Sequence, residues 1–159
     1  MHAKGSYFTR GSGHDKYGRY TEDSDAYVEV MDRILAKIGS AADHVPAPEV
    51  FETDRGKGVG IVSIGGCHWA VLEARDALAS EGIEVDYLRI RGFPFNKTVE
   101  EFLESHKAVI VIEQNRDEQL KNLLLLETSC AKEKLQSVRY YGGQPLSKEH
   151  VIDGVTPFL

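Results

Sequence analysis

Apolar residues between positions 27 and 38 repeat with the period of one helical face. They occupy positions i, i+3, i+4, i+7, i+8 and i+11, and they are Tyr27, Val30, Met31, Ile34, Leu35 and Ile38. This spacing places the apolar side chains on one side of an α-helix. Ser24 can cap the start of this helix, and Gly39 lies where a left-handed C-terminal cap would be. We therefore expect an amphipathic helix, preceded by a polar, glycine-rich arm between Tyr7 and Asp23.

The pattern changes at residue 58. Residues 40–57 contain two prolines and a charged run, which predicts a linker, whereas short β-branched runs alternate with helical periods beyond it. The expected strands are residues 59–64, 83–90, 108–112 and 137–141, and the expected helices are residues 69–80, a short helix capped by Thr98 and Glu101, residues 117–127, and a last helix capped by Ser147.

This order of elements predicts the fold class. Alternating strands and helices with right-handed crossovers give an α/β domain, three layers (α/β/α) around an open, mostly parallel sheet. We therefore divide the chain into an N-terminal arm, helix and linker, residues 1–57, and an α/β domain, residues 58–159. The arm and helix need a surface to pack on, either this domain or another chain.

Composition and charge narrow the range of partners. The 159 residues are 42% hydrophobic and 28% charged, as expected of one globular domain with an extension. Nineteen Lys and Arg against 25 Asp and Glu give a net charge of −6, which argues against nucleic acid. The longest apolar runs fall far short of the roughly 20 residues of a membrane-spanning helix, and no apolar centre of a secretory signal follows Met1. We expect a cytoplasmic protein with no membrane contact.

Cysteine and histidine spacing argues against metal chemistry in this chain. Two cysteines are too few for a disulfide framework, or for an iron–sulfur cluster held by four thiolates. The six histidines never lie three or four residues apart, so no helical metal-binding pair exists. We expect no metal site and no cofactor bound by this chain alone.

Three segments follow the expected strands, at the sheet edge where ligands and partners bind in open α/β folds. The candidate ligand or interface residues in them are Gly65, Gly66, Cys67, His68, Arg91, Phe93, Phe95 and Arg116. The glycine-rich first segment leads into a helix N-terminus that could receive an anion. Because neither G-x-G-x-x-G nor the Walker pattern is present, a tight strand-to-helix turn is favoured over phosphate binding.

The remaining candidates each allow two interpretations. Cys67 and His68 could be nucleophile and base, but adjacent side chains point in different directions, which favours a buried structural cysteine. Phe93 and Phe95 could pack locally over the sheet edge or serve as interface anchors. Glu113 and Asn115 could orient a loop or act as catalytic carboxylate and amide.

The arm also has two interpretations. Arg10 and His14 lie among flexible glycines, as polar groups of a solvated tail or of an arm that becomes ordered against a neighbouring active site.

Four motifs in this order resemble one family. They are TRGSGHDKYGRYTED, GIVSIGGCHWAVLEARDAL, DYLRIRGFPF and VIVIEQNRDEQLKNLL. Together they are similar to the C-terminal half of the alpha subunit of 2-oxoacid:ferredoxin oxidoreductases, most closely the 2-oxoglutarate type. The resemblance covers about residues 7 to 155, and it implies a fold like the C-terminal domain of transketolases.

The resemblance also implies an activity and partners. Such complexes use thiamine diphosphate, Mg and 4Fe-4S clusters to convert a 2-oxoacid and coenzyme A into acyl-CoA and CO2, with electrons passed to ferredoxin, or run the reverse reaction. The implied partners are the beta subunit and a pyrimidine-binding domain, neither of which this chain contains, and ferredoxin acts indirectly. The chain would then serve assembly and active-site shaping, would be inactive alone, and could also self-associate as a homodimer.

One position departs from the family pattern. Glu118 stands where many relatives have glycine in N-x-x-G-Q-L, whereas Asn115, Gln119 and Leu120 are kept. A glycine there would permit a close backbone approach. The alternatives from other classes are a stand-alone nucleotide- or coenzyme-A-binding module, and an interaction protein anchored by Phe93 and Phe95.

Overall fold

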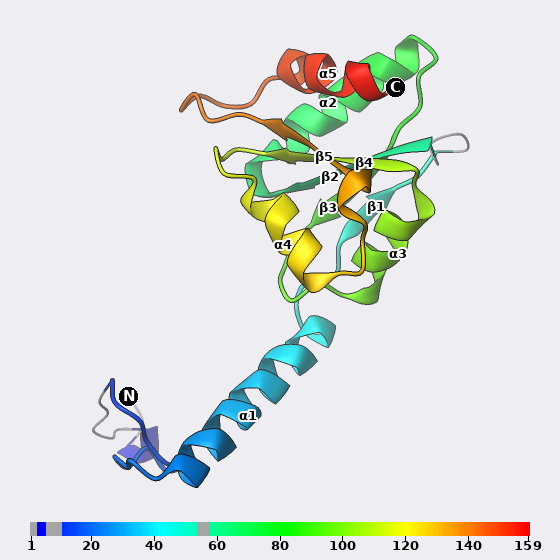
Figure 1. Cartoon of the computed structure of the whole chain (residues 1–159). Coiled ribbons are helices and arrows are strands. Elements are labelled where there is room, and N and C mark those ends of the chain that lie inside the picture. Colours follow the sequence, from blue (N-terminus) through cyan, green and yellow to red (C-terminus); the bar gives the residue numbers. More distant parts are fainter. Residues whose placement is uncertain (1–2, 6–10, 54–57) are drawn as a thin grey trace. The chain divides into compact units, whose positions relative to one another are not determined.

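The computed structural model describes residues 3–5, 11–53 and 58–159 (Figure 1). The chain forms two compact units, Met1–His44 and Val45–Leu159.

The first unit is built on helix α1, Ser24–Ser40. Its N-cap is Asp23, whose carboxylate accepts a hydrogen bond from the Ala26 amide at 2.8 Å, so the cap precedes the expected Ser24. The helix also continues through Gly39 to a cap at Ala41. Short 3-10 turns, Ala3–Gly5 and Ala41–Asp43, accompany it.

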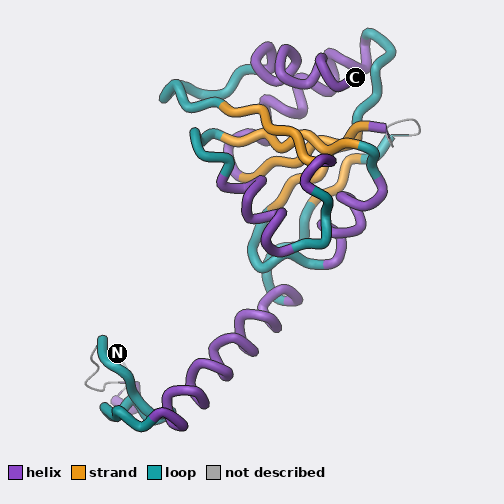
Figure 2. The backbone as a smooth tube through the Cα atoms, viewed as in Figure 1, coloured by secondary structure: helices purple, strands orange, loops and turns teal. Residues whose placement is uncertain are grey.

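The second unit is a five-stranded sheet between two layers of helices (Figures 1 and 2). The strands are β1 (Glu49–Phe51), β2 (Val59–Ile64), β3 (Asp86–Ile90), β4 (Ala108–Glu113) and β5 (Leu135–Arg139). The helices are α2 (His68–Ser80), α3 (Lys97–Ser105), α4 (Gln119–Glu127) and α5 (Lys148–Val155), with 3-10 turns at Gly65–Cys67, Lys132–Lys134 and Thr156–Phe158. The strand order is β1-β3-β2-β4-β5, with β1 antiparallel and the other pairs parallel.

Alternating side chains along the strands build two cores. Ile61 faces the core formed with α2 and α5, while its neighbour Val62 faces the core formed with α3 and α4. The interior strand β4 is buried from Val109 to Glu113, which explains its continuous apolar run. The predicted three-layer, mostly parallel α/β fold is confirmed.

One strand lies in the segment that the sequence assigned to a linker. Strand β1 pairs with β3, with Val50 opposite Leu88. The Arg75 guanidinium donates hydrogen bonds to the carbonyls of Phe51 and Val85, at 3.1 and 2.9 Å. Just after the strand, the Asp86 carboxylate accepts hydrogen bonds from the backbone and hydroxyl of Thr53. A three-residue strand is too short to give a periodic signal, so these distant contacts define it.

Other boundaries shift by a few residues. Strand β3 begins at Asp86 instead of residue 83, and β5 covers Leu135–Arg139 instead of 137–141. The predicted Thr98–Glu101 capping box is wrong, because the N-cap of α3 is Asn96, which makes no side-chain cap hydrogen bond. Ser147 does cap α5, accepting from the His150 amide. Within the described ranges, no helix is long and apolar enough to cross a membrane.

Candidate functional site

The predicted loops leave the same edge of the sheet. Ser63 near the end of β2 lies beside Arg89 of β3 and Ile112 of β4, in parallel register. The segments after β2, β3 and β4 therefore emerge together at the carboxyl edge (Figure 2).

The turn between β2 and α2 is a 3-10 turn, Gly65–Cys67, that opens directly into the helix. Gly65 has φ = 66°, a left-handed conformation in which glycine carries no steric penalty. A Cβ on Gly66 would lie 3.1 Å from the Gln114 amide oxygen, so the loop after β4 packs closely on this turn. Neither the 3-10 turn nor α2 has a side-chain N-cap.

His68 begins α2 and lies almost entirely within the protein. Its exposure is 5%, and its Nδ1 lies 3.2 Å from the Tyr87 hydroxyl, which lies 2.8 Å from the Ser63 hydroxyl. Burial, followed by the nearby positive charge of Arg89, lowers the pKa of His68. Burial raises the pKa of Tyr87 to about 12. The three side chains form a buried polar chain between the sheet and the start of α2.

Cys67 is a buried side chain without an activating base. Its exposure is 1%, and burial raises the pKa of its thiol to about 11, so the nucleophilic thiolate is scarce at neutral pH. Its sulfur contacts the Gln114 amide oxygen at 3.9 Å, whereas Nδ1 of the adjacent His68 contacts Tyr87. The structural interpretation of Cys67 is confirmed.

Two arginines and a glutamate meet where β1 borders β3. Arg89 Nη1 lies 3.0 Å from Glu49 Oε2, and Arg91 Nη1 lies 3.2 Å from Glu49 Oε1. The hydrogen bond from Arg89 lowers the pKa of Glu49. The Arg89 Nε atom is buried and has no hydrogen-bond partner among the residues that the structure describes. Periodicity alone missed Glu49 and Arg89, because one lies in the supposed linker and the other inside a strand.

Aromatic side chains at this edge differ in exposure. Phe93 is 43% exposed and meets Phe95 edge to face, with ring centroids 5.3 Å apart, while Phe95 is partly buried against the core. Phe95 thus packs locally, whereas the exposed Phe93 ring could contact a partner. Trp69 is 71% exposed, with its ring centroid 4.8 Å from that of His68.

Glu113 organises the loop after β4. Its buried carboxylate accepts hydrogen bonds from the amides of Leu120 and Lys121, at 2.8 and 3.3 Å, and from the Asn115 side chain. The Asn115 oxygen in turn accepts from the amides of Asp117 and Gln119. The two residues therefore hold the loop and cap α4, the loop-orienting role that the sequence allowed.

The end of this loop requires a left-handed residue. Glu118 has φ = 55° and ψ = 41°, and its carboxylate pairs with Lys121 at 3.2 Å and with Arg139 at 3.6 Å. This conformation favours glycine, the residue that the resemblance predicts at this position. Arg116 pairs with Asp117, at 2.7 Å, and remains largely exposed.

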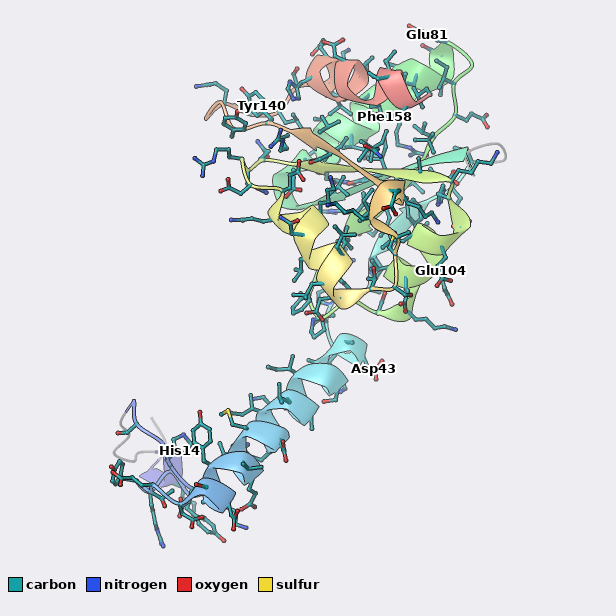
Figure 3. All side chains as sticks on the ribbon, viewed as in Figure 1. His14, Asp43, Glu81, Glu104, Tyr140 and Phe158 are labelled. Carbon is teal, nitrogen blue, oxygen red and sulfur yellow. The ribbon has the colours of Figure 1, made fainter. Side chains whose placement is uncertain are left out.

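The described part of the arm is a folded turn. His14 and Tyr20 form an antiparallel bridge, and one oxygen of Asp15 accepts from the amides of Tyr17 and Arg19, each at 2.9 Å. His14 Nδ1 lies 2.8 Å from the Asp15 carbonyl (His14 is labelled in Figure 3). An ion pair from Lys16 to Glu29, at 3.0 Å, ties the turn to α1. The described part of the arm is therefore a folded turn without a buried side chain, and Arg10 lies outside the described residues.

Potential metal ligands do not gather in the described ranges. Among the residues that the structure describes, no group of three or more His, Cys, Asp or Glu side chains could hold a metal ion. These residues therefore do not fit an iron–sulfur cluster or the magnesium ion of a diphosphate site.

Comparison with known proteins places this geometry in context. No family model matches the chain. The chain is 33% identical over 153 residues to 2-oxoacid:ferredoxin oxidoreductase 2, subunit alpha, of Aeropyrum pernix, covering 94% of this chain and 24% of that protein. It is 27% identical over 150 residues to the 2-oxoacid:ferredoxin oxidoreductase subunit alpha of Saccharolobus solfataricus, covering 91% and 23%.

A solved structure of the same kind of enzyme matches the fold of this chain. The 2-oxoglutarate:ferredoxin oxidoreductase from Magnetococcus marinus, with 2-oxoglutarate, coenzyme A and succinyl-CoA bound, matches with a TM-score of 0.82 and 25% identity. The match covers 96% of this chain and 26% of that one. The chain spans about a quarter of the length of the curated relatives, less than the half that the motifs implied. Over that quarter, the chain is homologous to the alpha subunits of 2-oxoacid:ferredoxin oxidoreductases.

Proposed function

We propose that this chain is part of the alpha subunit of a thiamine-diphosphate-dependent 2-oxoacid:ferredoxin oxidoreductase that uses 2-oxoglutarate. The complex converts the 2-oxoacid and coenzyme A into acyl-CoA and CO2 and passes electrons to ferredoxin. The observation that carries this proposal is the 33% identity over 94% of the chain. A match of that extent includes most of the first unit, so the relationship is not confined to a common α/β fold.

The chain's own role is assembly and active-site shaping, with the beta subunit and a pyrimidine-binding domain as partners. Exposed apolar side chains support this role, among them Leu35 on α1 and Trp69 and Phe93 at the sheet edge. The folded arm turn supports it too, because a preformed turn can dock with little loss of conformational entropy. In this proposal, thiamine diphosphate, magnesium and the iron–sulfur clusters are held by other parts of the complex.

Reconstitution tests this proposal. The chain is co-purified with a candidate beta subunit and pyrimidine-binding domain, and reduction of a low-potential dye is assayed with 2-oxoglutarate and coenzyme A. We expect activity that requires all three parts. Stable folding of the chain with neither association nor dependence would contradict the proposal.

A substitution in the arm tests whether the arm contributes to the same complex. We expect His14→Ala to lower turnover or assembly, because the turn that carries His14 would lie at an interface. His44→Ala is the control, since His44 is exposed and lies outside the turn. Equal turnover and assembly in the two variants would remove the arm from the proposal.

A further inference from the structure

A buried histidine and a buried aspartate meet beside the edge strand β1. His106 and Asp86 are 3% and 1% exposed, and His106 Nε2 lies 3.1 Å from Asp86 Oδ2. The other carboxylate oxygen, Oδ1, accepts hydrogen bonds from the amide and the hydroxyl of Thr53, at 2.7 and 3.1 Å. The pair therefore holds the segment that follows β1.

The hydrogen bonds of His106 require one proton between the two side chains. Nδ1 lies 2.8 Å from the Phe102 carbonyl oxygen, which can only accept, so Nδ1 carries a proton. The Ser105 hydroxyl donates to the same carbonyl and so does not supply a proton to Nδ1. At the other nitrogen, the hydrogen bond with Asp86 needs a second proton, either on Nε2 or on Oδ2. The pair is thus an imidazolium with a carboxylate or an imidazole with a carboxylic acid, and both forms hold this proton in common.

Loss of the shared proton would turn the contact from attractive to repulsive. The lone pair of His106 Nε2 would then face the Asp86 carboxylate across 3.1 Å, in a place that water hardly reaches. A buried anion that has lost its donor is costly unless water replaces that donor. The folded chain must therefore keep the proton or open a path for water.

Arg75 of α2 also acts on the pair. Burial lowers the pKa of Arg75, and the charge of Asp86 acts against this lowering. The guanidinium donates its hydrogen bonds to the carbonyls of Phe51 and Val85. It therefore attracts the carboxylate without replacing the donor on His106. In the described ranges, no other charged side chain forms a hydrogen bond or ion pair with Asp86 or His106.

The packing around the pair leaves the β1 side as the place where water can enter. On β2, a Cβ on Gly60 would lie 3.1 Å from His106 Cδ2, and on α3 the centroid of the Phe102 ring lies 4.2 Å from that of the His106 ring. Thr53, in contrast, is only partly buried and lines a surface pocket. The other residues of this pocket are Arg75, Asp76, Ala79, Glu84 and Val85. Hydration of the pair therefore requires movement at Thr53.

We propose that the proton shared by Asp86 and His106 holds β1 on the sheet, and that its loss at raised pH releases the strand. Strand β1 carries Glu49, whose carboxylate binds both Arg89 and Arg91, at 3.0 and 3.2 Å. Release of β1 therefore frees two guanidinium groups at the carboxyl edge for a partner or ligand. This device does not rest on the proposed function, because every group in it belongs to this chain.

The number of protons in each state gives the direction of the effect. Above about pH 6.5, the ordinary titration range of histidine, an unfolded chain has released the proton that the folded pair still holds. Unfolding then releases a proton, so stability falls as the pH rises, by up to about tenfold in the folding equilibrium constant for each pH unit. Below that range both states hold the proton, and the contribution is constant.

Asp86→Asn tests the proposal, because it keeps the hydrogen bonds without the shared proton. Its amide oxygen can accept from Thr53, and its NH2 group can donate to Nε2 of a neutral His106. Urea denaturation gives the folding equilibrium constants of both chains from pH 6 to pH 8.5. We expect the ratio of the unaltered chain to the variant to fall at least about tenfold over this range. Asp76→Asn, at an exposed position of α2, is the matched control, and its ratio should stay constant.

Hydrogen exchange of the whole unaltered chain locates the release. We expect the protection of the amides of residues 49–53, relative to those of β4 at the same pH, to fall about tenfold between pH 6 and pH 8.5, and to stay constant in Asp86→Asn. If Asp86→Asn does not fold, the comparison of β1 with β4 in the unaltered chain decides alone. A constant ratio of equilibrium constants, or equal protection of β1 relative to β4 at both pH values, would overturn the proposal.

Discussion

At the scale of single residues, the backbone conformation of Glu118 destabilises the fold while its side chain stabilises it. Glu118 is left-handed, which costs a non-glycine residue about 1 kcal/mol. Its carboxylate partly offsets that cost through ion pairs with Lys121 and Arg139. Since those pairs are partly exposed, each contributes little.

Glu118→Gly and Glu118→Ala should therefore differ in stability. Both lose the ion pairs, but only glycine relieves the left-handed conformation, so we expect the glycine variant to be more stable than the alanine variant by about 1 kcal/mol. Urea denaturation measures the difference. An alanine variant as stable as the glycine variant would show that position 118 relaxes out of the left-handed region.

The two cysteines should differ in reactivity. Burial raises the pKa of Cys67 to about 11, so at pH 8 only about one thiol in a thousand is ionised, and the side chain is also shielded. Cys130 is more exposed, and burial raises its pKa as well. We expect iodoacetamide at pH 8 to label Cys130 first and Cys67 only after unfolding, as read by mass spectrometry. Rapid labelling of Cys67 in the folded chain would restore the nucleophile hypothesis.

At the scale of elements, side chains of one element form hydrogen bonds with the backbone of another. Helix α4 has no side-chain cap on its own N-cap residue, and Glu113 at the end of β4 accepts its amides instead. The edge strand β1 likewise depends on Arg75 of α2 and on Asp86 of β3. Strand β1 and the start of α4 are thus held by side chains from neighbouring elements.

Removing the carboxylate of Glu113 should weaken α4. In Glu113→Gln, one amide oxygen cannot replace two acceptor oxygens, and an NH2 group faces the amides of the helix. We expect a loss of about 2 kcal/mol of unfolding free energy, because buried donors lose their partner. Glu127→Gln, at the exposed end of the same helix, is the control and should change stability by less than about 0.5 kcal/mol. Equal losses in the two variants would refute the capping role.

Asp86 should decide whether β1 stays paired. Its carboxylate accepts from Thr53 and from Nε2 of the buried His106, at 3.1 Å. We expect Asp86→Ala to cost about 3 kcal/mol, since it leaves buried donors unpartnered. Hydrogen exchange should accelerate at the amides of residues 49–53 more than in β2 and β4. Asp76→Ala, at an exposed position, is the control, and uniform exchange across the sheet would contradict a local role.

At the scale of the whole molecule, the first unit buries little of the apolar face of its helix. Only Val30 of α1 is buried, while Leu35 is 66% and Ile38 46% exposed. Exposed apolar side chains on one helix face are typical of an interaction surface. This agrees with a chain that covers about a quarter of its relatives.

The double variant Leu35→Ser, Ile38→Ser tests that surface. We expect the thermal unfolding of the α/β unit to be unchanged, because the substituted side chains are exposed. Co-purification with the partner subunits should fall at least tenfold, a loss of about 1.4 kcal/mol of binding free energy. Ala36→Ser on the same helix is the control. Undiminished assembly of the double variant would place the interface elsewhere.

Much of the architecture could be predicted from the sequence. The apolar period predicted α1, and the alternation of strand and helix patterns predicted the three layers and the shared carboxyl edge, because periodicity is a local property of the chain. The motifs, in turn, indicated the family. Boundaries were less accurate, as at β3 and in the capping box of α3.

Only the tertiary structure decided which distant side chains meet. Thr53 bonds to Asp86, 33 residues away, and His68 bonds to Tyr87, 19 residues away. Neither contact leaves a periodic signal, since each depends on the register of strands that pair after the chain folds. The sequence by itself therefore determined the elements and their order. The folded structure decided the edge strand, the cap of α4 and the orientation of His68, because hydrogen bonds between distant residues form only when packing brings them together.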